Sequence, residues 1–165
     1  MDILRRLKPS DFLQVVAVYR DAVMSQAQGL YSQVQIEAWA ENAGRDDGLR
    51  NALQRGYGLA SCAGRDSSTI EAFALLDPID RLSLLYCRGR ASRQGRATAL
   101  LHAIEDRARQ HGCACLRTEA SQLSRPLLER EGWRVDAEEE VIFAGVRFLR
   151  WRMIKELILS PNCLT

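Results

Sequence analysis

The chain has 165 residues, of which 47% are hydrophobic and 27% are charged. This balance is typical of a globular protein with one hydrophobic core and excludes a disordered chain. The 23 basic and 21 acidic residues leave a net charge of +2, which favours neither nucleic acid nor an anionic membrane surface as a partner.

The first nine residues carry scattered charges and no long apolar stretch, so we expect no signal peptide. No apolar run approaches the roughly 20 residues that cross a bilayer. We therefore expect a cytoplasmic protein with no membrane partner. Weak alternation over 3–7 predicts a first strand, which Lys8-Pro9 ends.

The next third of the chain has helical patterns. Ser10-Asp11 precedes apolar residues at helical spacing, which predicts a long helix. A capping box at 32–35 predicts a short helix through Trp39, and a third short helix is predicted over 47–54, stopped by Gly56.

From residue 57 the pattern becomes mainly extended. The predicted strands are 57–62, 69–76, 82–87 and 113–119, and a final hairpin joins 140–143 to 146–153 through Ala144-Gly145. An amphipathic helix is predicted over 95–110, and a shorter one ends at Arg130. Three consecutive strands with short turns favour an α/β (α+β) protein with a mostly antiparallel sheet. We expect one domain over 1–157 and a C-terminal tail over 158–165.

Five cysteines are present, an odd number, and four lie within or beside apolar runs, which favours buried free thiols over a disulfide framework. They are Cys62, Cys87, Cys113, Cys115 and Cys163. Only one residue separates Cys113 from Cys115, whereas zinc sites usually have two to four between paired cysteines, and the chain has only two histidines. We expect no metal site.

The segment 93–101 follows the strand 82–87 and opens the amphipathic helix. Small residues at Gly95, Ala97 and Ala99 let the backbone approach a ligand, and a helix N-terminus offers unpaired N–H groups to an anion. The segment therefore predicts a pyrophosphate cradle, although a tight turn alone also requires small residues. The Gly-Lys-Ser/Thr of a Walker A loop is missing, and so is the full glycine set of a Rossmann fingerprint.

The residues Ser92-Arg93-Gln94-Gly95-Arg96-Ala97 resemble the Gln/Arg-x-x-Gly-x-Gly/Ala motif of the GNAT superfamily of N-acetyltransferases, except at the first position. Other segments resemble, in the same order, one bacterial branch of that superfamily: Tyr31-Ser32, Glu37-Ala38-Trp39-Ala40, 118–121, 124–133, Gly145-Val146 and 153–155. The resemblance covers essentially the whole chain. It implies a GNAT-type mixed, mostly antiparallel sheet of six to seven strands flanked by about four helices, with acetyl-CoA as cosubstrate.

The resemblance also implies which residues hold acetyl-CoA. The backbone of Leu85, Tyr86 and Cys87 would pair with the pantetheine arm, and the turn amides would hold the pyrophosphate. The implied cofactor-binding set is completed by Arg93, Gln94, Gly95, Arg96, Ala97, Thr98 and Ser121. Arg93 offers a guanidinium beside Ser92, which replaces the usual glutamine or arginine. The side chain of Arg96 is either a solvated arginine at the helix start or an additional contact to a CoA phosphate.

The residues that many superfamily members use for proton transfer are not matched in this chain. The tyrosine that many superfamily members use corresponds to Leu128, and a glutamate often found on the fourth strand corresponds roughly to Ser83. The candidate catalytic residues are Glu119 and Tyr86, with Tyr31 or a water relay as alternatives. Glu119 is equally well interpreted as a structural carboxylate that pairs with Arg117 or Arg125.

The resemblance places the acceptor pocket between the first two helices and the closing hairpin. Its candidate walls are Tyr31, Trp39, Phe143 and Trp151, each of which is also a natural core aromatic. The expected activity is direct acetyl transfer to a primary amine of a small molecule or peptide within a ternary complex. The alternative is a catalytically degenerate CoA-binding or interaction module. A homodimer remains open.

Overall fold

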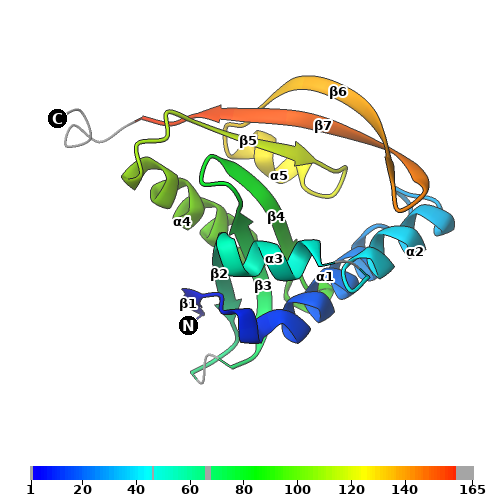
Figure 1. Ribbon diagram of the computed structural model, residues 1–165, viewed down its shortest axis with the longest axis horizontal. Coiled ribbons are helices and arrows are strands. Elements are labelled where there is room, and N and C mark those ends of the chain that lie inside the picture. The colour runs from blue at the N-terminus through cyan, green and yellow to red at the C-terminus, as the bar shows by residue number, and fades with distance from the viewer. Residues whose placement is uncertain (1, 46, 66–67, 159–165) are drawn as a thin grey trace.

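The computed structural model describes residues 2–45, 47–65 and 68–158 (Figure 1). Its strands are β1 (Ile3–Arg6), β2 (Tyr57–Cys62), β3 (Ile70–Leu76), β4 (Arg81–Cys87), β5 (Cys115–Ala120), β6 (Arg134–Phe143) and β7 (Val146–Glu156). Its helices are α1 (Phe12–Gln26), α2 (Gln33–Asn42), α3 (Gly48–Arg55), α4 (Arg96–Gln110) and α5 (Arg125–Arg130), with short 3₁₀ turns η1 (Pro9–Asp11) and η2 (Gly89–Ala91). No helix among these residues is long and apolar enough to cross a membrane.

The seven strands form one sheet in the order β1-β2-β3-β4-β5-β7-β6. Every neighbouring pair is antiparallel except β4 and β5, which are parallel. The predicted mixed, mostly antiparallel sheet with flanking helices is therefore confirmed.

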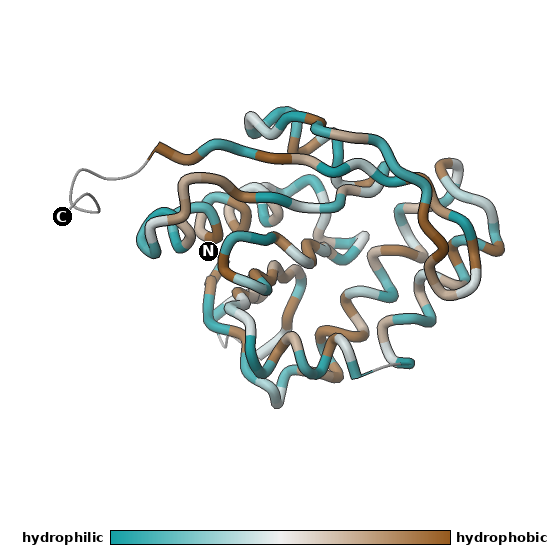
Figure 2. Tube along the Cα trace, turned by 45° about the horizontal axis from the view of Figure 1, so that its top comes forward, coloured by the Kyte–Doolittle hydropathy of each residue, from teal (hydrophilic) through white to brown (hydrophobic). Residues whose placement is uncertain are grey.

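Two hydrophobic clusters cover the two faces of the sheet. Along β3, Phe73 belongs to the cluster under α1, α2 and α3, whereas its neighbours Ala72 and Ala74 belong to the cluster under α4 and α5. Because successive side chains of a strand point to opposite faces, the two clusters lie on opposite sides. All seven residues of β3 are buried, and Figure 2 shows hydrophobic residues along the central strands. We call the two sides the α1 face and the α4 face.

The closing hairpin is longer than predicted. The sequence pattern indicated strands over 140–143 and 146–153, but β6 begins at Arg134 and β7 ends at Glu156. The predicted turn is present, with positive φ at both Ala144 and Gly145. The first half of β6 was not predicted because it is rich in acidic residues, which are uncommon in strands. In the sheet they pair with arginines of β7, as Glu139 does with Arg150 at 2.6 Å.

Two further expectations need correction. The strand β5 begins at Cys115, so Cys113 lies before it. The thiols are not uniformly buried: Cys62 is, Cys87 and Cys113 are partly so, and Cys115 is exposed. Cys163 and the predicted tail beyond residue 158 lie outside the described residues.

A buried carboxylate on α4 links this helix to the sheet. Glu105 of α4, whose side chain is 2% exposed, accepts hydrogen bonds from Trp133 Nε1 at 3.1 Å and from Lys155 Nζ at 2.8 Å. Lys155 lies on β7, so this one side chain ties the helix to the far strands of the sheet. A buried charge is tolerated only when it is paired and hydrogen-bonded, as this one is.

Replacing this carboxylate by an amide tests its contribution. In Glu105→Gln the ammonium of Lys155 loses its counter-charge in a mostly buried place, so we expect the free energy of unfolding to fall by about 3 kcal/mol. The exposed pair of Glu129 with Arg125 provides the control, and Glu129→Gln should change stability by less than about 0.5 kcal/mol. Urea denaturation followed by circular dichroism measures both. Equal effects would contradict the assigned role of Glu105.

Candidate functional site

The sheet opens where β4 and β5 stop pairing. These two strands pair only at Arg81↔Arg117 and Leu82↔Thr118. At the last pair the Thr118 hydroxyl donates a hydrogen bond to the Leu82 carbonyl at 2.6 Å. Beyond it, β5 continues along β7 and β4 continues along β3, so the β5 side of β4 has no neighbouring strand.

A bulge at Ser83 accompanies this separation. Against β3, Leu82 pairs with Leu76 but Leu84 pairs with Leu75, which leaves Ser83 as an extra residue. Its hydroxyl donates to the Leu75 carbonyl at 3.2 Å. A bulge bends its strand, which is the physical reason that β4 leaves β5 at this point.

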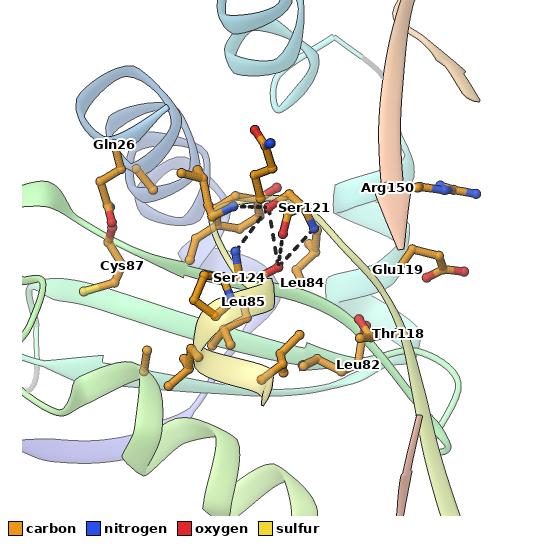
Figure 3. Close-up of a pocket in the computed structure, with 18 of the residues that line it drawn as sticks. Gln26, Leu82, Leu84, Leu85, Cys87, Thr118, Glu119, Ser121, Ser124 and Arg150 are labelled. Carbon is orange, nitrogen blue, oxygen red and sulfur yellow. Dashed lines mark hydrogen bonds between the residues drawn. The ribbon is translucent and has the colours of Figure 1, made fainter. Parts of the chain in front are cut away.

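The bulge leaves backbone groups facing the opening. Arg88 N donates to Glu71 O at 2.8 Å, and hydrogen-bonded and non-hydrogen-bonded pairs alternate along an antiparallel ladder. By this alternation Leu85 and Cys87 turn their N–H and C=O groups away from β3, while Tyr86 turns its own toward β3. The Cys87 carbonyl accepts a hydrogen bond from Gln26 Nε2 at 2.7 Å (Figure 3). Both groups of Leu85 and the N–H of Cys87 thus face the gap.

The gap is part of a cleft of about 1080 Å³. Leu84 and Tyr86 line it from the α1 face, and Leu85 and Cys87 line it from the α4 face. Because side chains of both faces border one cavity, the cleft passes through the sheet. A ligand that enters from the α4 face can therefore meet another that enters from the α1 face.

The turn before α4 forms one end of this cleft. Gly95 has φ +82°, a left-handed conformation that favours glycine, and nothing lies within 4 Å of the place where a Cβ would be. The helix begins at Arg96, and its first N–H groups have no partner within the helix. Arg93, Ala97 and Thr98 also line the cleft here. Open space beside unpaired amides at a helix N-terminus fits a phosphate group.

The position of the Arg96 side chain differs from both interpretations drawn from the sequence. The side chain is neither solvated nor free for a phosphate: it is 7% exposed and reaches back to the N-terminal strands. Its guanidinium donates to Ser61 Oγ at 2.9 Å and to Asp2 Oδ1 at 2.7 Å. Side chains in the first turn of a helix point toward its N-terminus, which here directs this one onto β2. Any role of Arg96 at a phosphate therefore falls to its backbone N–H, and that role stays a prediction.

A serine-rich loop forms the wall opposite β4. Ser121 Oγ accepts hydrogen bonds from the amides of Leu123 and Ser124 at 3.1 and 3.3 Å, and Ser124 Oγ accepts one from Ser121 N at 3.1 Å (Figure 3). The Tyr31 hydroxyl accepts a hydrogen bond from Gln122 N at 2.9 Å. The loop is therefore held both internally and by the segment between α1 and α2.

Aromatic residues line the α1 side of the cleft. Trp39 Nε1 donates to the Tyr86 hydroxyl at 3.0 Å, and the rings of Tyr86 and Tyr19 lie 4.4 Å apart. Burial raises the pKa of the Tyr86 phenol well above its usual range, and burial also raises the pKa of Tyr31. Both phenols therefore keep their protons at physiological pH.

Three of the four predicted pocket aromatics line the cleft: Tyr31, Trp39 and Phe143. Trp151 does not. It belongs to the core of the α4 face, and the guanidinium of Arg125 lies 4.8 Å from the centre of its ring. The alternation of side chains along β7 turns Trp151 into the core of the α4 face, opposite to its neighbours Arg150 and Arg152.

Glu119 lines the cleft, but its ion-pair partner differs from those predicted. Its carboxylate accepts a hydrogen bond from Arg81 Nε at 3.0 Å. Arg117 lies instead beside Asp80, at 3.6 Å. The parallel pairing of β4 with β5 brings Arg81 and Glu119 together, and no local sequence pattern reveals that contact. Gln26 and Arg150 also line the cleft and were missed for the same reason.

Comparison with known proteins identifies the family. Residues 27–155 match the model of the Acetyltransferase (GNAT) domain. The chain belongs to the GNAT family of acetyltransferases. No curated protein matches it. Among the described residues of this GNAT protein, no group of three His, Cys, Asp or Glu side chains could hold a metal ion.

Solved GNAT structures share the fold. A GCN5-related N-acetyltransferase from Rhodopseudomonas palustris, described as a class II aminotransferase, is 24% identical with a TM-score of 0.86, over 95% of this chain and 96% of that one. The PaiA N-acetyltransferase of Thermoplasma acidophilum, in complex with coenzyme A, is 20% identical with a TM-score of 0.73, over 94% and 99%. YncA of Salmonella typhimurium, with acetyl-CoA, is 17% identical with a TM-score of 0.64, over 97% and 96%. At these identities the likeness concerns the fold.

The thiol of Cys87 reports on the cleft. Burial raises its pKa to about 11, so only about one thiol in a thousand is ionised at pH 8. We expect iodoacetamide at pH 8 to label the exposed Cys115 well before Cys87, as measured by peptide mass spectrometry. Raising the pH toward 10 should increase the rate at Cys87 about tenfold per unit. Labelling of Cys87 as fast as that of Cys115 at pH 8 would contradict the burial of this thiol.

Proposed function

We propose that this GNAT-family protein transfers an acetyl group from acetyl-CoA to a primary amine, directly and within a ternary complex. One observation carries the proposal: the uncovered edge of β4 and the turn at Gly95 border the same cleft, which passes through the sheet. The structures of relatives with coenzyme A and acetyl-CoA support this choice of cosubstrate. Residues 1–157 act as one domain in this proposal.

The backbone would bind the cosubstrate. Both groups of Leu85 and the N–H of Cys87 would pair with the amides of the pantetheine arm, as an added strand would. The amides from Arg96 to Thr98 and the space beside Gly95 would hold the pyrophosphate. The Arg93 guanidinium adds a positive charge at the same end.

The thioester supplies an activated acyl group, and the protein must remove a proton from the acceptor. The nitrogen–carbon bond forms as the carbon–sulfur bond breaks, so the amine loses a proton and CoA leaves as a thiolate. Glu119 is the carboxylate in the cleft and would accept that proton, directly or through a water molecule. Tyr86 and Tyr31 stay protonated because burial raises the pKa of each, so neither would take the proton from the amine.

A second candidate function is binding of CoA without turnover. Leu128 is buried in the core of the α4 face, and the Ser83 hydroxyl is engaged by the Leu75 carbonyl. Neither of these positions offers a group that moves a proton. This version of the protein would bind the cosubstrate and release no thiol with any amine.

A substitution at Gly95 tests where the phosphates lie. Gly95→Glu places a carboxylate in the proposed cradle, so we expect the Kd for acetyl-CoA to rise at least about tenfold. Gly112→Glu is a matched control, because Gly112 has φ +75°, equally open surroundings and a place at the other end of α4. Both variants carry the same backbone strain. Isothermal titration calorimetry measures the Kd of both variants for acetyl-CoA. An unchanged affinity in Gly95→Glu would contradict the placement of the phosphates at this turn.

A substitution at Glu119 tests proton transfer. Glu119→Gln removes the proposed proton acceptor but keeps its shape, so kcat should fall about 100-fold while the KM for acetyl-CoA changes less than about twofold. Glu140→Gln serves as the control, because Glu140 lies on β6 and is exposed. Release of CoA thiol measures the rates. If kcat in Glu119→Gln stays within threefold of the parent, another group or solvent takes the proton.

A further inference from the structure

The charged side chains offered to the cleft are those of Arg81, Arg93, Glu119, Arg130 and Arg150, because the guanidinium of Arg96 is held by Ser61 and Asp2. A cleft that binds a polycationic acceptor needs the opposite balance, because like charges raise the cost of binding. Since Arg81 pairs with Glu119 and the arginines near CoA serve its phosphates, Arg150 is the positive charge left for the acceptor, and it favours an acceptor that carries a negative charge of its own over a polyamine.

The arginines divide between the two sides of the sheet. Arg93 lies in the turn before α4 and Arg130 lies in α5, on the side where CoA would bind. Arg150 lies on β7 two residues from Phe148, which packs in the core of the α1 face, so Arg150 points to the α1 face as well. Figure 3 shows the side chains of Glu119 and Arg150 leaving their strands in the same direction.

Arg150 has hydrogen-bonding capacity left for a ligand. Its Nε donates to Glu139 Oε1 at 2.6 Å, which fixes the plane of the guanidinium. Among the described residues, neither of its terminal nitrogens has a hydrogen-bond partner, and the side chain is 38% exposed. Glu139 also lies 3.5 Å from Arg152, so the three side chains together keep one positive charge. A fixed guanidinium with two free N–H faces is suited to a carboxylate.

Glu119 lies beside this group with the opposite charge. It pairs across the strands with Arg152, and Arg150 is two residues further along β7. Such diagonal neighbours have Cβ atoms about 7–8 Å apart. An ammonium and a carboxylate bonded to the same carbon can fit between two side chains at that spacing, with the ammonium on Glu119 and the carboxylate on Arg150.

The rest of the acceptor side is apolar. Leu30 lines the cleft although it is 49% exposed, and the rings of Tyr31 and Phe143, which pack against the core of the α1 face, line it beside Leu30. Apolar surface left open in a cleft is suited to an apolar ligand group.

We propose that the acceptor is a free amino acid, with its carboxylate next to the reacting amine and an aromatic or large apolar side chain. Arg150 binds the carboxylate, Glu119 receives the amine, and the wall of Leu30, Tyr31 and Phe143 holds the side chain. This inference rests on the proposed acetyl transfer and names the substrate class for the same site.

The test compares two acceptors that differ by the carboxylate, L-phenylalanine and phenethylamine, in the full-length protein with acetyl-CoA. Arg150→Met should raise the KM for phenylalanine at least about tenfold and leave the KM for phenethylamine nearly unchanged. Arg147→Met is the control, because Arg147 lies on the same strand, is exposed and does not line the cleft. Each acceptor is compared between the variant and the parent protein, so the different basicity of the two amines does not affect the comparison.

The outcomes distinguish failure of the amino-acid acceptor from failure of acetyl transfer itself. A loss confined to phenylalanine in Arg150→Met supports the amino-acid acceptor. Equal effects on both amines, or faster acetylation of spermidine than of phenylalanine, overturns it while acetyl transfer itself stands. If no amine is acetylated although acetyl-CoA binds in calorimetry, the proposed function fails and this inference fails with it.

Discussion

The parallel pairing of β4 with β5 ends after two residue pairs, and the cleft exists because of that ending. An uncovered strand edge inside a sheet is costly, since each backbone N–H and C=O needs a partner. The structure tolerates it because both halves are stable without the missing pairs. On one side β3 is fully buried, and on the other β5 pairs along its whole length with β7. The bulge at Ser83 then determines where the edge is exposed.

The same opening separates two kinds of charge. The α4 face offers backbone amides and arginines, which suit phosphates, whereas the α1 face offers Glu119 beside Arg150 in an apolar surround. Two substrates of different chemistry would therefore approach from opposite faces and meet at β4. Direct transfer requires such a meeting and no covalent intermediate on the protein. The departures at Leu128 and Ser83 leave Glu119 with the proton chemistry in this scheme.

Local patterns predicted most of the fold. The boundaries of β2 match the prediction, because apolar residues between turn signals read clearly as a strand. The first half of β6 was missed, because an acidic residue such as Glu139 fits a strand there only when β7 supplies the arginines that pair with it. The cleft turn at Gly95 could be predicted because its chemistry is local. The buried side chain of Arg96 and the pairing of Glu119 with Arg81 could not, because both depend on strands distant in the sequence.

The central claim is that β4 presents unpaired backbone groups to acetyl-CoA, and residue-resolved amide hydrogen exchange by NMR tests it most directly. In the free protein the amides of Leu85 and Cys87 should exchange rapidly, while that of Tyr86, which faces β3, should be protected. Saturating acetyl-CoA should slow exchange at Leu85 and Cys87 by at least about tenfold. Protection of both amides before acetyl-CoA is added, or no change after it, would contradict the account.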